Sequence, residues 1–259
     1  MRNPRFIHLL PLLAAAGLLL AACQPGASAG ATSTAGGGAT TGGGSTGGAA
    51  IIISKDILLD PALATDADSK TVNAYLYESL VTLSGSDVAP ALAQAWSVSD
   101  DGLSYTFNLR PSASFHDGTP LTAEAVMANF NRWFDPADAL HGAGAYAGWA
   151  AALFGFKGEL GADGRPKSPY DGMEKVDNLT VLVHLNREDP DFVLKLTQPS
   201  FAIVSPAALA AGAGYGTGTG VSGTGPYKVS EWSDETLVLG PNAAYWNGAP
   251  AAGLTFKLQ

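Results

Sequence analysis

Residues 92–133 read LAQAWSVSDDGLSYTFNLRPSASFHDGTPLTAEAVMANFNRW, and this stretch contains a strand pattern followed by a turn pattern. Apolar and polar side chains alternate over residues 105–109, which is typical of a strand with one buried face. Residues 116–120, HDGTP, combine a glycine, which permits unusual backbone angles, with a proline, which fixes φ. The sequence therefore predicts a strand that is followed by a tight turn.

A helix is expected directly after this turn, because the spacing of apolar side chains changes there from two residues to the helical repeat. Thr122 is suited to be the N-cap, and Glu124 in the first turn suits the positive end of the helix dipole. The apolar positions with helical spacing are Val126, Met127, Phe130, Trp133 and Phe134.

Length and composition narrow the possible classes of protein. The chain has 259 residues, a net charge of −9, 46% hydrophobic residues and a single cysteine. That length suits one large domain or two small ones. The acidic balance argues against a nucleic-acid partner, because binding to phosphate backbones needs clustered Lys and Arg. One cysteine allows no intrachain disulfide, and no metal-ligand spacing is present, so we expect no metal and no cofactor.

The N-terminus has the pattern of a membrane-targeting signal. Arg2 and Arg5 precede an apolar run that ends in Leu20-Ala21-Ala22-Cys23. A transmembrane anchor and an ordinary secretory signal are the alternatives, but the only cysteine lies at the position where a bacterial lipoprotein is acylated. We therefore predict a lipoprotein signal peptide at residues 1–22. Residues 23–50 are then the lipidated Cys23 and a disordered Gly/Ser/Thr linker.

Several short sequence motifs between residues 59 and 250 resemble those of one known family. The pattern P-x-LA-x-x-W, D-G-x-x-Y-T-F-x-LR, F-x-DG-x-P-x-TA-x-DV is matched, except that Ala125 replaces the usual acid. Two later motifs of the family are also present: GTGPY at residues 223–227 and N-x-x-Y-W-x-G-x-P at residues 242–250. The chain thus resembles the N-terminal half of the extracellular solute-binding proteins, family 5, which serve peptide- and nickel-type ABC importers. The matching residues of the first pattern are Pro90, Leu92, Ala93, Trp96, Asp101, Gly102, Tyr105, Thr106, Phe107, Leu109, Arg110, Phe115, Asp117, Gly118, Pro120, Thr122, Ala123, Glu124 and Val126.

The resemblance implies an α/β fold of the periplasmic-binding-protein type (type II, cluster C), a two-lobed clamp that closes on its solute. Family members are about twice as long, so the second lobe is expected to be lacking here. For residues 51–259 the resemblance implies a first-lobe core, built from residues 51–80 and 200–259. Residues 81–199 are expected to form an inserted α/β subdomain.

The resemblance also suggests which residues face the solute. In the family, the loop that follows an Asp-Pro pair lines the ligand cleft, and the pair here is Asp60-Pro61. A tyrosine-bearing segment faces the ligand as well. Two alternatives remain open: the loop is simply solvated, and the tyrosine is a core or surface aromatic. The implied ligand-binding residues are Thr65, Asp66, Ala67, Asp68 and Tyr146.

Other elements are predicted from local patterns. We expect a strand at residues 51–54, a helix capped by Asp68 or Ser69, and a helix at residues 143–154. Residues 173–185 should turn and then form a strand with Leu179, Val181, Val183 and Leu185 on one face, and residues 227–232 should form a strand. Residues 218–223, GTGVSG, match the dinucleotide-binding pattern, but that site needs a following helix, so we reject it.

The expected function is that of the substrate-binding component of an ABC importer. Its partners would be a small solute, in the first place a peptide, the ABC permease, and the membrane through the lipid on Cys23. The protein would lie outside the cytoplasm, on the periplasmic or outer face of a bacterial membrane. The alternative is a truncated lipoprotein that does not transport, either an interaction or sensory module or a pseudogene product. We expect no catalytic residues, because the turn and the family pattern already explain His116 beside Asp117.

Overall fold

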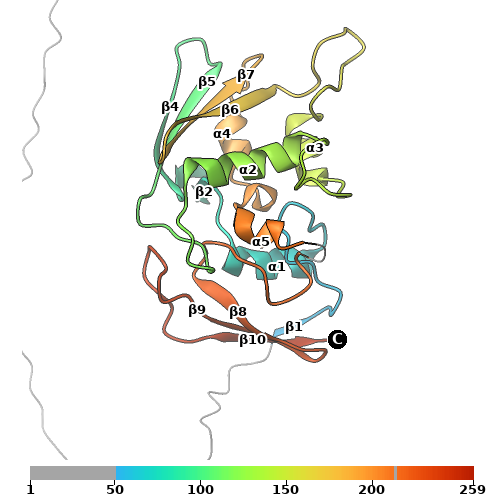
Figure 1. Cartoon of the computed structure of the whole chain (residues 1–259), viewed down its shortest axis with the longest axis vertical. Helices are drawn as coiled ribbons and strands as arrows, with labels where there is room; N and C mark the ends of the chain where they lie inside the picture. Colours follow the sequence, from blue (N-terminus) through green and yellow to red (C-terminus); the bar gives the residue numbers. More distant parts are fainter. Residues whose placement is uncertain (1–50, 213–214) are drawn as a thin grey trace, which may run out of the picture. The chain divides into compact units, whose positions relative to one another are not determined.

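The computed structural model describes residues 51–212 and 215–259, which form two four-stranded sheets, a two-stranded hairpin and several short helices (Figure 1). The predicted signal peptide, Cys23 and the linker lie outside the described residues. None of the helices in the described part is both long and apolar enough to span a bilayer.

The first sheet is antiparallel and contains the strand that the sequence predicts most clearly. Its order is β4 (Ala93–Val98), β5 (Ser104–Leu109), β7 (Thr180–Leu185) and β6 (Tyr170–Asp177). The predicted alternation is confirmed in β5, where Tyr105, Phe107 and Leu109 are buried and their neighbours are half-buried.

Within residues 173–185 the predicted strand is confirmed as β7, but the turn expected from residue 173 is wrong at its start, because residues 170–177 form strand β6. This strand is at the edge of the sheet and buries only Tyr170 and Met173. Two irregularities in its pairing with β7 interrupt the alternation of its side chains. An edge strand that is mostly exposed leaves no hydrophobic period in the sequence.

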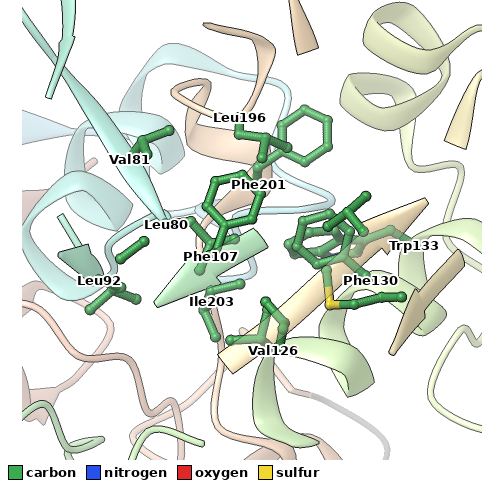
Figure 2. Packing of buried hydrophobic residues seen from close by; sticks show 14 of the residues in the cluster. Leu80, Val81, Leu92, Phe107, Val126, Phe130, Trp133, Leu196, Phe201 and Ile203 are labelled. Atoms are coloured by element: carbon green, nitrogen blue, oxygen red, sulfur yellow. The ribbon is translucent and has the colours of Figure 1, made fainter. Parts of the chain in front are cut away.

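Helix α2 (Ala123–Phe134) begins where predicted and packs against β6 and β7 of this sheet (Figure 1). Thr122 is its N-cap and accepts a hydrogen bond of 3.2 Å from the backbone of Ala125. Glu124 is exposed and forms an ion pair with Lys175 of β6. Figure 2 shows Val126, Phe130 and Trp133 of α2 in one cluster with Phe107 and Phe201.

The second sheet has the order β1 (Ile51–Ile53), β10 (Leu254–Leu258), β9 (Thr236–Pro241) and β8 (Tyr227–Trp232). β1 is parallel to β10, and the other pairs are antiparallel. Helix α1 (Ala67–Leu76) lies over this sheet and contacts β8 (Figure 1). The strands predicted at residues 51–54 and 227–232 are confirmed, and β8 follows the glycine-rich segment where a nucleotide site would need a helix.

The N-cap of α1 is Asp66, so the prediction of Asp68 or Ser69 is wrong. The Asp66 side chain accepts a hydrogen bond of 2.7 Å from the backbone of Ser69. Asp68 and Ser69 instead bind residues that precede the helix in the chain: Asp68 accepts from the backbone of Ser54 at 2.7 Å, and Ser69 accepts from Leu58 at 2.8 Å. All three side chains suit a cap, and the tertiary contacts decide between them.

The remaining elements of the described chain are a hairpin and four short helical elements. The hairpin consists of β2 (Val81–Ser84) and β3 (Asp87–Pro90). The helical elements are α3 (Ala147–Leu153), α4 (Phe192–Lys195), the 3-10 helix η1 (Pro199–Phe201) and α5 (Pro206–Ala210). The predicted helix at residues 143–154 is therefore shorter than expected, because Tyr146 has a left-handed backbone with φ of 44° and cannot lie inside a helix.

The buried apolar side chains form two clusters. One includes Phe107, Phe130 and Trp133 around the first sheet, and the other includes Val72, Leu239 and other residues around the second sheet. The chain passes from one cluster to the other near residues 77–80 and again near residues 201–204. The division into a first-lobe core and an inserted subdomain stays a prediction.

Asn129 joins α2 to the second of these crossings. Its side chain is fully buried and donates to the backbone oxygen of Val204 at 2.7 Å, while its own oxygen accepts from the Val204 N–H at 3.0 Å. It also donates to Ala125 within α2 at 2.9 Å. Because all three contacts are shielded from water, this residue fixes how residues 202–205 lie on the helix.

Candidate functional site

A cavity of about 340 Å³ lies beside the loop that the sequence analysis places in the ligand cleft. Thr65 contributes an exposed side chain to its wall, and Ala147 and Gly148 contribute the first turn of α3. Of the predicted ligand-binding residues, Thr65 alone lines this cavity. The lining residues are Pro61, Ala62, Ala64, Thr65, Lys70, Ala147, Gly148, Gln198, Pro199 and Ser200.

The loop is held in place by an ion pair that the sequence analysis did not predict. Asp60 and Arg132 are 1% and 3% exposed, and the Arg132 guanidinium donates to both carboxylate oxygens of Asp60. Arg132 also donates to the backbone oxygen of Leu140 at 3.1 Å, and Asp60 accepts from the backbone of Ala62 at 3.2 Å. Burial lowers the pKa of Arg132, but the hydrogen bonds and charge of Asp60 outweigh this and raise it. Arg132 therefore stays charged.

Tyr146 is buried next to this ion pair. Its ring is 1% exposed and its centroid is 5.4 Å from the Arg132 guanidinium carbon. Its hydroxyl donates to the backbone oxygen of His141 at 2.6 Å. The side chain thus supports the start of α3, whose residues Ala147 and Gly148 reach the cavity. A direct contact between Tyr146 and a solute stays a prediction.

Asp66, Ala67 and Asp68 lie at the start of α1, and two of them have defined structural contacts. Partial burial raises the pKa of Asp66, but the hydrogen bonds from Ser69 outweigh it and lower the pKa below its usual value. Asp66 is therefore an ionised cap, while Asp68 holds Ser54. Their ligand-binding roles also stay predictions.

A second cavity, of about 420 Å³, lies between the end of α1 and residues 245–247, and it shares Pro61 and Pro199 with the first. The Glu78 carboxylate lies on its wall and accepts hydrogen bonds from Thr224 and Tyr245 at 2.9 Å each. The Trp246 indole donates to both of its oxygens, at 3.0 and 3.2 Å. Burial raises the pKa of Glu78 in spite of these donors.

The predicted HDGTP turn lies against the GTGPY turn, and His116 forms most of this contact. Its Nδ1 accepts from the backbone N–H of Gly223 at 3.3 Å, and its Nε2 lies 3.1 Å from the backbone oxygen of Gly225. These two partners require a neutral ring with its proton on Nε2. Burial lowers the pKa of His116 accordingly. The ring therefore has a structural role at this contact.

Glycine is needed at two positions of the GTGPY turn. A Cβ atom on Gly223 would lie 2.1 Å from the backbone oxygen of Leu76, and one on Gly225 would lie 2.6 Å from the Leu76 carbonyl carbon. The turn thus packs directly against the last residues of α1, next to Glu78. Among residues 51–212 and 215–259, no group of three or more His, Cys, Asp or Glu is arranged to hold a metal ion.

Comparison with known proteins identifies the family. The sequence pattern of the bacterial extracellular solute-binding proteins, family 5, matches residues 87–257, more than half of the chain. The chain belongs to this family. The glutathione-binding protein GsiB of Escherichia coli K12 is 33% identical over 190 residues, which are 73% of this chain and 33% of that protein. The chain therefore spans about a third of the length of the curated relatives it matches.

Solved structures of the family share the fold. HbpA2 from Haemophilus parasuis superposes with a TM-score of 0.68 at 27% identity and covers 81% of this chain and 42% of its own. DppA from Helicobacter pylori, in complex with the peptide STSA, has a TM-score of 0.66 at 27% identity and covers 78% of this chain and 40% of its own. The chain is therefore a periplasmic-binding-protein-like α/β protein, as predicted. Members of the family are extracytoplasmic binding proteins rather than enzymes.

We predict that breaking the Asp60–Arg132 pair destabilises the protein strongly. The substitution R132M leaves the Asp60 carboxylate buried without its partner, which costs about 3–5 kcal/mol in the free energy of unfolding. Urea denaturation of both proteins measures the difference. The matched control is K157M, which breaks the exposed Lys157–Asp135 pair and should cost no more than about 1 kcal/mol. Equal losses for the two variants would contradict a dominant role for the buried pair.

We predict that His116 makes the stability depend on pH below its usual pKa of 6.5. The folded protein lowers this pKa, so the unfolded chain binds the proton first as the pH falls. The contribution is therefore complete above pH 6.5 and is lost as the pH decreases toward the folded pKa. Urea midpoints between pH 5 and 8 should fall more steeply with acid for the wild type than for H116N. Glu78 has a raised pKa, so its contribution to stability increases as the pH falls; because it is present in both proteins, this effect cancels in the comparison. Parallel curves for the two proteins would rule out the role of His116.

Proposed function

We propose that this chain captures a small solute, in the first place a peptide, outside the bacterial membrane and delivers it to the permease of an ABC importer. The observation that supports this most directly is the cavity beside the Asp60 loop in a chain that belongs to family 5. Two similar proteins, GsiB and DppA, bind glutathione and a peptide according to their names. The chain spans only part of the length of such proteins, so the importer role is proposed for a complete solute-binding protein that contains this part.

The walls of this cavity suit the main chain of a peptide. Thr65 and Ser200 supply hydroxyl groups and Gln198 supplies an amide, each able to donate and accept hydrogen bonds. Of the lining residues in the described part of the chain, Lys70 alone has a formal charge, and its ammonium group suits a peptide carboxylate. We propose that Thr65 and Lys70 contact the solute, that Asp66, Ala67 and Asp68 hold the loop, and that Tyr146 positions α3.

We predict that peptides with a free carboxylate raise the melting temperature of the full chain, because a ligand of the native state stabilises it. Thermal-shift measurements with di- and tripeptides, each compared with its C-terminal amide, test this. The amides should bind a few-fold more weakly, and K70M should remove that difference because it removes the ammonium group.

A second pair of variants localises the binding. T65F places a ring in the cavity and should abolish the shift, whereas T71F, an exposed position on α1 outside the cavity lining, should leave it unchanged. The proposal fails if peptides cause no shift, or if T65F retains the wild-type response.

We further propose that Cys23 is acylated and that residues 24–50 tether the domain to the membrane. In a bacterial host, the mature wild-type protein should carry the mass of its acyl chains and remain with the membrane fraction, because more than one chain is needed for stable anchoring. C23S should lose both properties, and S28A should keep them. Mass spectrometry of the mature protein that detects no added acyl group on Cys23 would contradict the proposal.

A further inference from the structure

We propose that the cavity beside Glu78 is a second binding site, which takes a small primary amine with an apolar body. The site goes beyond the proposed capture of a solute at the Thr65 cavity. The two cavities share Pro61 and Pro199 but differ in charge: the first contains Lys70 and the second contains Glu78. They therefore select opposite charges.

Among the described residues that line the second cavity, Glu78 alone carries a formal charge. Within the described part of the chain, it takes part in none of the ion pairs. The Arg110 guanidinium instead lies 3.9 Å from the centroid of the Trp246 ring and donates to the backbone oxygen of Ala91. The carboxylate thus has neutral hydrogen-bond donors and no bonded cation, and Arg110 acts on it only through its charge, which favours the ionised form. A buried carboxylate without a bonded cation favours a cationic ligand.

The carboxylate also has room for one more donor. Its two oxygens offer about four acceptor positions. Thr224, Tyr245 and Trp246 supply three hydrogen atoms, and the single indole N–H is shared between the two oxygens. Each oxygen is thus approached by two donors, but three hydrogen atoms do not fill four acceptor positions completely, so an ammonium group can still donate beside the shared indole N–H.

The rest of the lining suits an apolar body of limited size. Four prolines and four small or branched aliphatic residues form most of the wall, together with the rings of Tyr77, Tyr245 and Trp246. The volume of about 420 Å³ is within the range of about 300–1,000 Å³ that is usual for small-molecule sites. One face of Trp246 is already covered by Arg110, so the carboxylate is the main attraction for a cation. The aliphatic lining residues are Ala74, Val81, Ala91 and Ala202, and the prolines are Pro61, Pro90, Pro199 and Pro226.

The test is a titration of the full chain with 2-phenylethylamine, followed by the indole N–H resonance of Trp246. W246F assigns that resonance. The neutral analogue 2-phenylethanol and the anion 3-phenylpropionate have similar bodies without the ammonium group. We expect the amine to shift the Trp246 resonance at lower concentration than either analogue. In E78Q its dissociation constant should rise about tenfold or more, because a charge-assisted hydrogen bond is lost.

Two variants control for charge and for folding. E231Q removes an exposed carboxylate of β8 outside the cavity and should bind the amine like the wild type. A74L fills the cavity from an exposed position on α1 without changing Glu78, and it should abolish the shift even if E78Q does not fold. T65F should leave amine binding intact.

Equal affinities for the amine and the alcohol would overturn the proposal, as would amine binding that survives in A74L or is lost in T65F. An unchanged dissociation constant in folded E78Q, or a Trp246 resonance that no concentration of the amine shifts, would overturn it as well.

Discussion

The buried pair of Asp60 and Arg132 is the interaction on which the arrangement of both cavities depends. It connects the loop before α1 with the last turn of α2, and so joins a segment near the second sheet to the helix that covers the first. Two charges that are 1% and 3% exposed need each other, because neither has water to replace its partner. Pro61 follows Asp60 directly and lines both cavities, so the pair positions the wall between them.

Polar side chains complete the connection between the two apolar clusters. Asn129 binds Val204 in both directions, and His116 binds the turn at residues 223–225 through both ring nitrogens. Apolar contacts alone would hold the clusters together without fixing their register, since the hydrophobic effect has no direction. Buried hydrogen bonds have a preferred geometry and supply that register.

The two cavities differ in the charge that they offer although they share part of their walls. Lys70 faces the cavity beside the Thr65 loop, and Glu78 faces the cavity beside Trp246. A carboxylate at one site and an amine at the other would therefore bind independently, unless the shared proline wall moves.

The sequence by itself determined the elements with a strong period and the family, since the alternation in β5 and the spacing in α2 follow from one buried face. Through a family resemblance it also suggested Thr65 as a ligand-binding residue; Thr65 lines a cavity, and its binding role stays a prediction. Tertiary structure decided the start of α1, the edge strand β6, and the pairs Asp60–Arg132 and Glu78–Trp246. The two pairs join residues that are 72 and 168 positions apart, and no local pattern specifies which polar side chain loses its water.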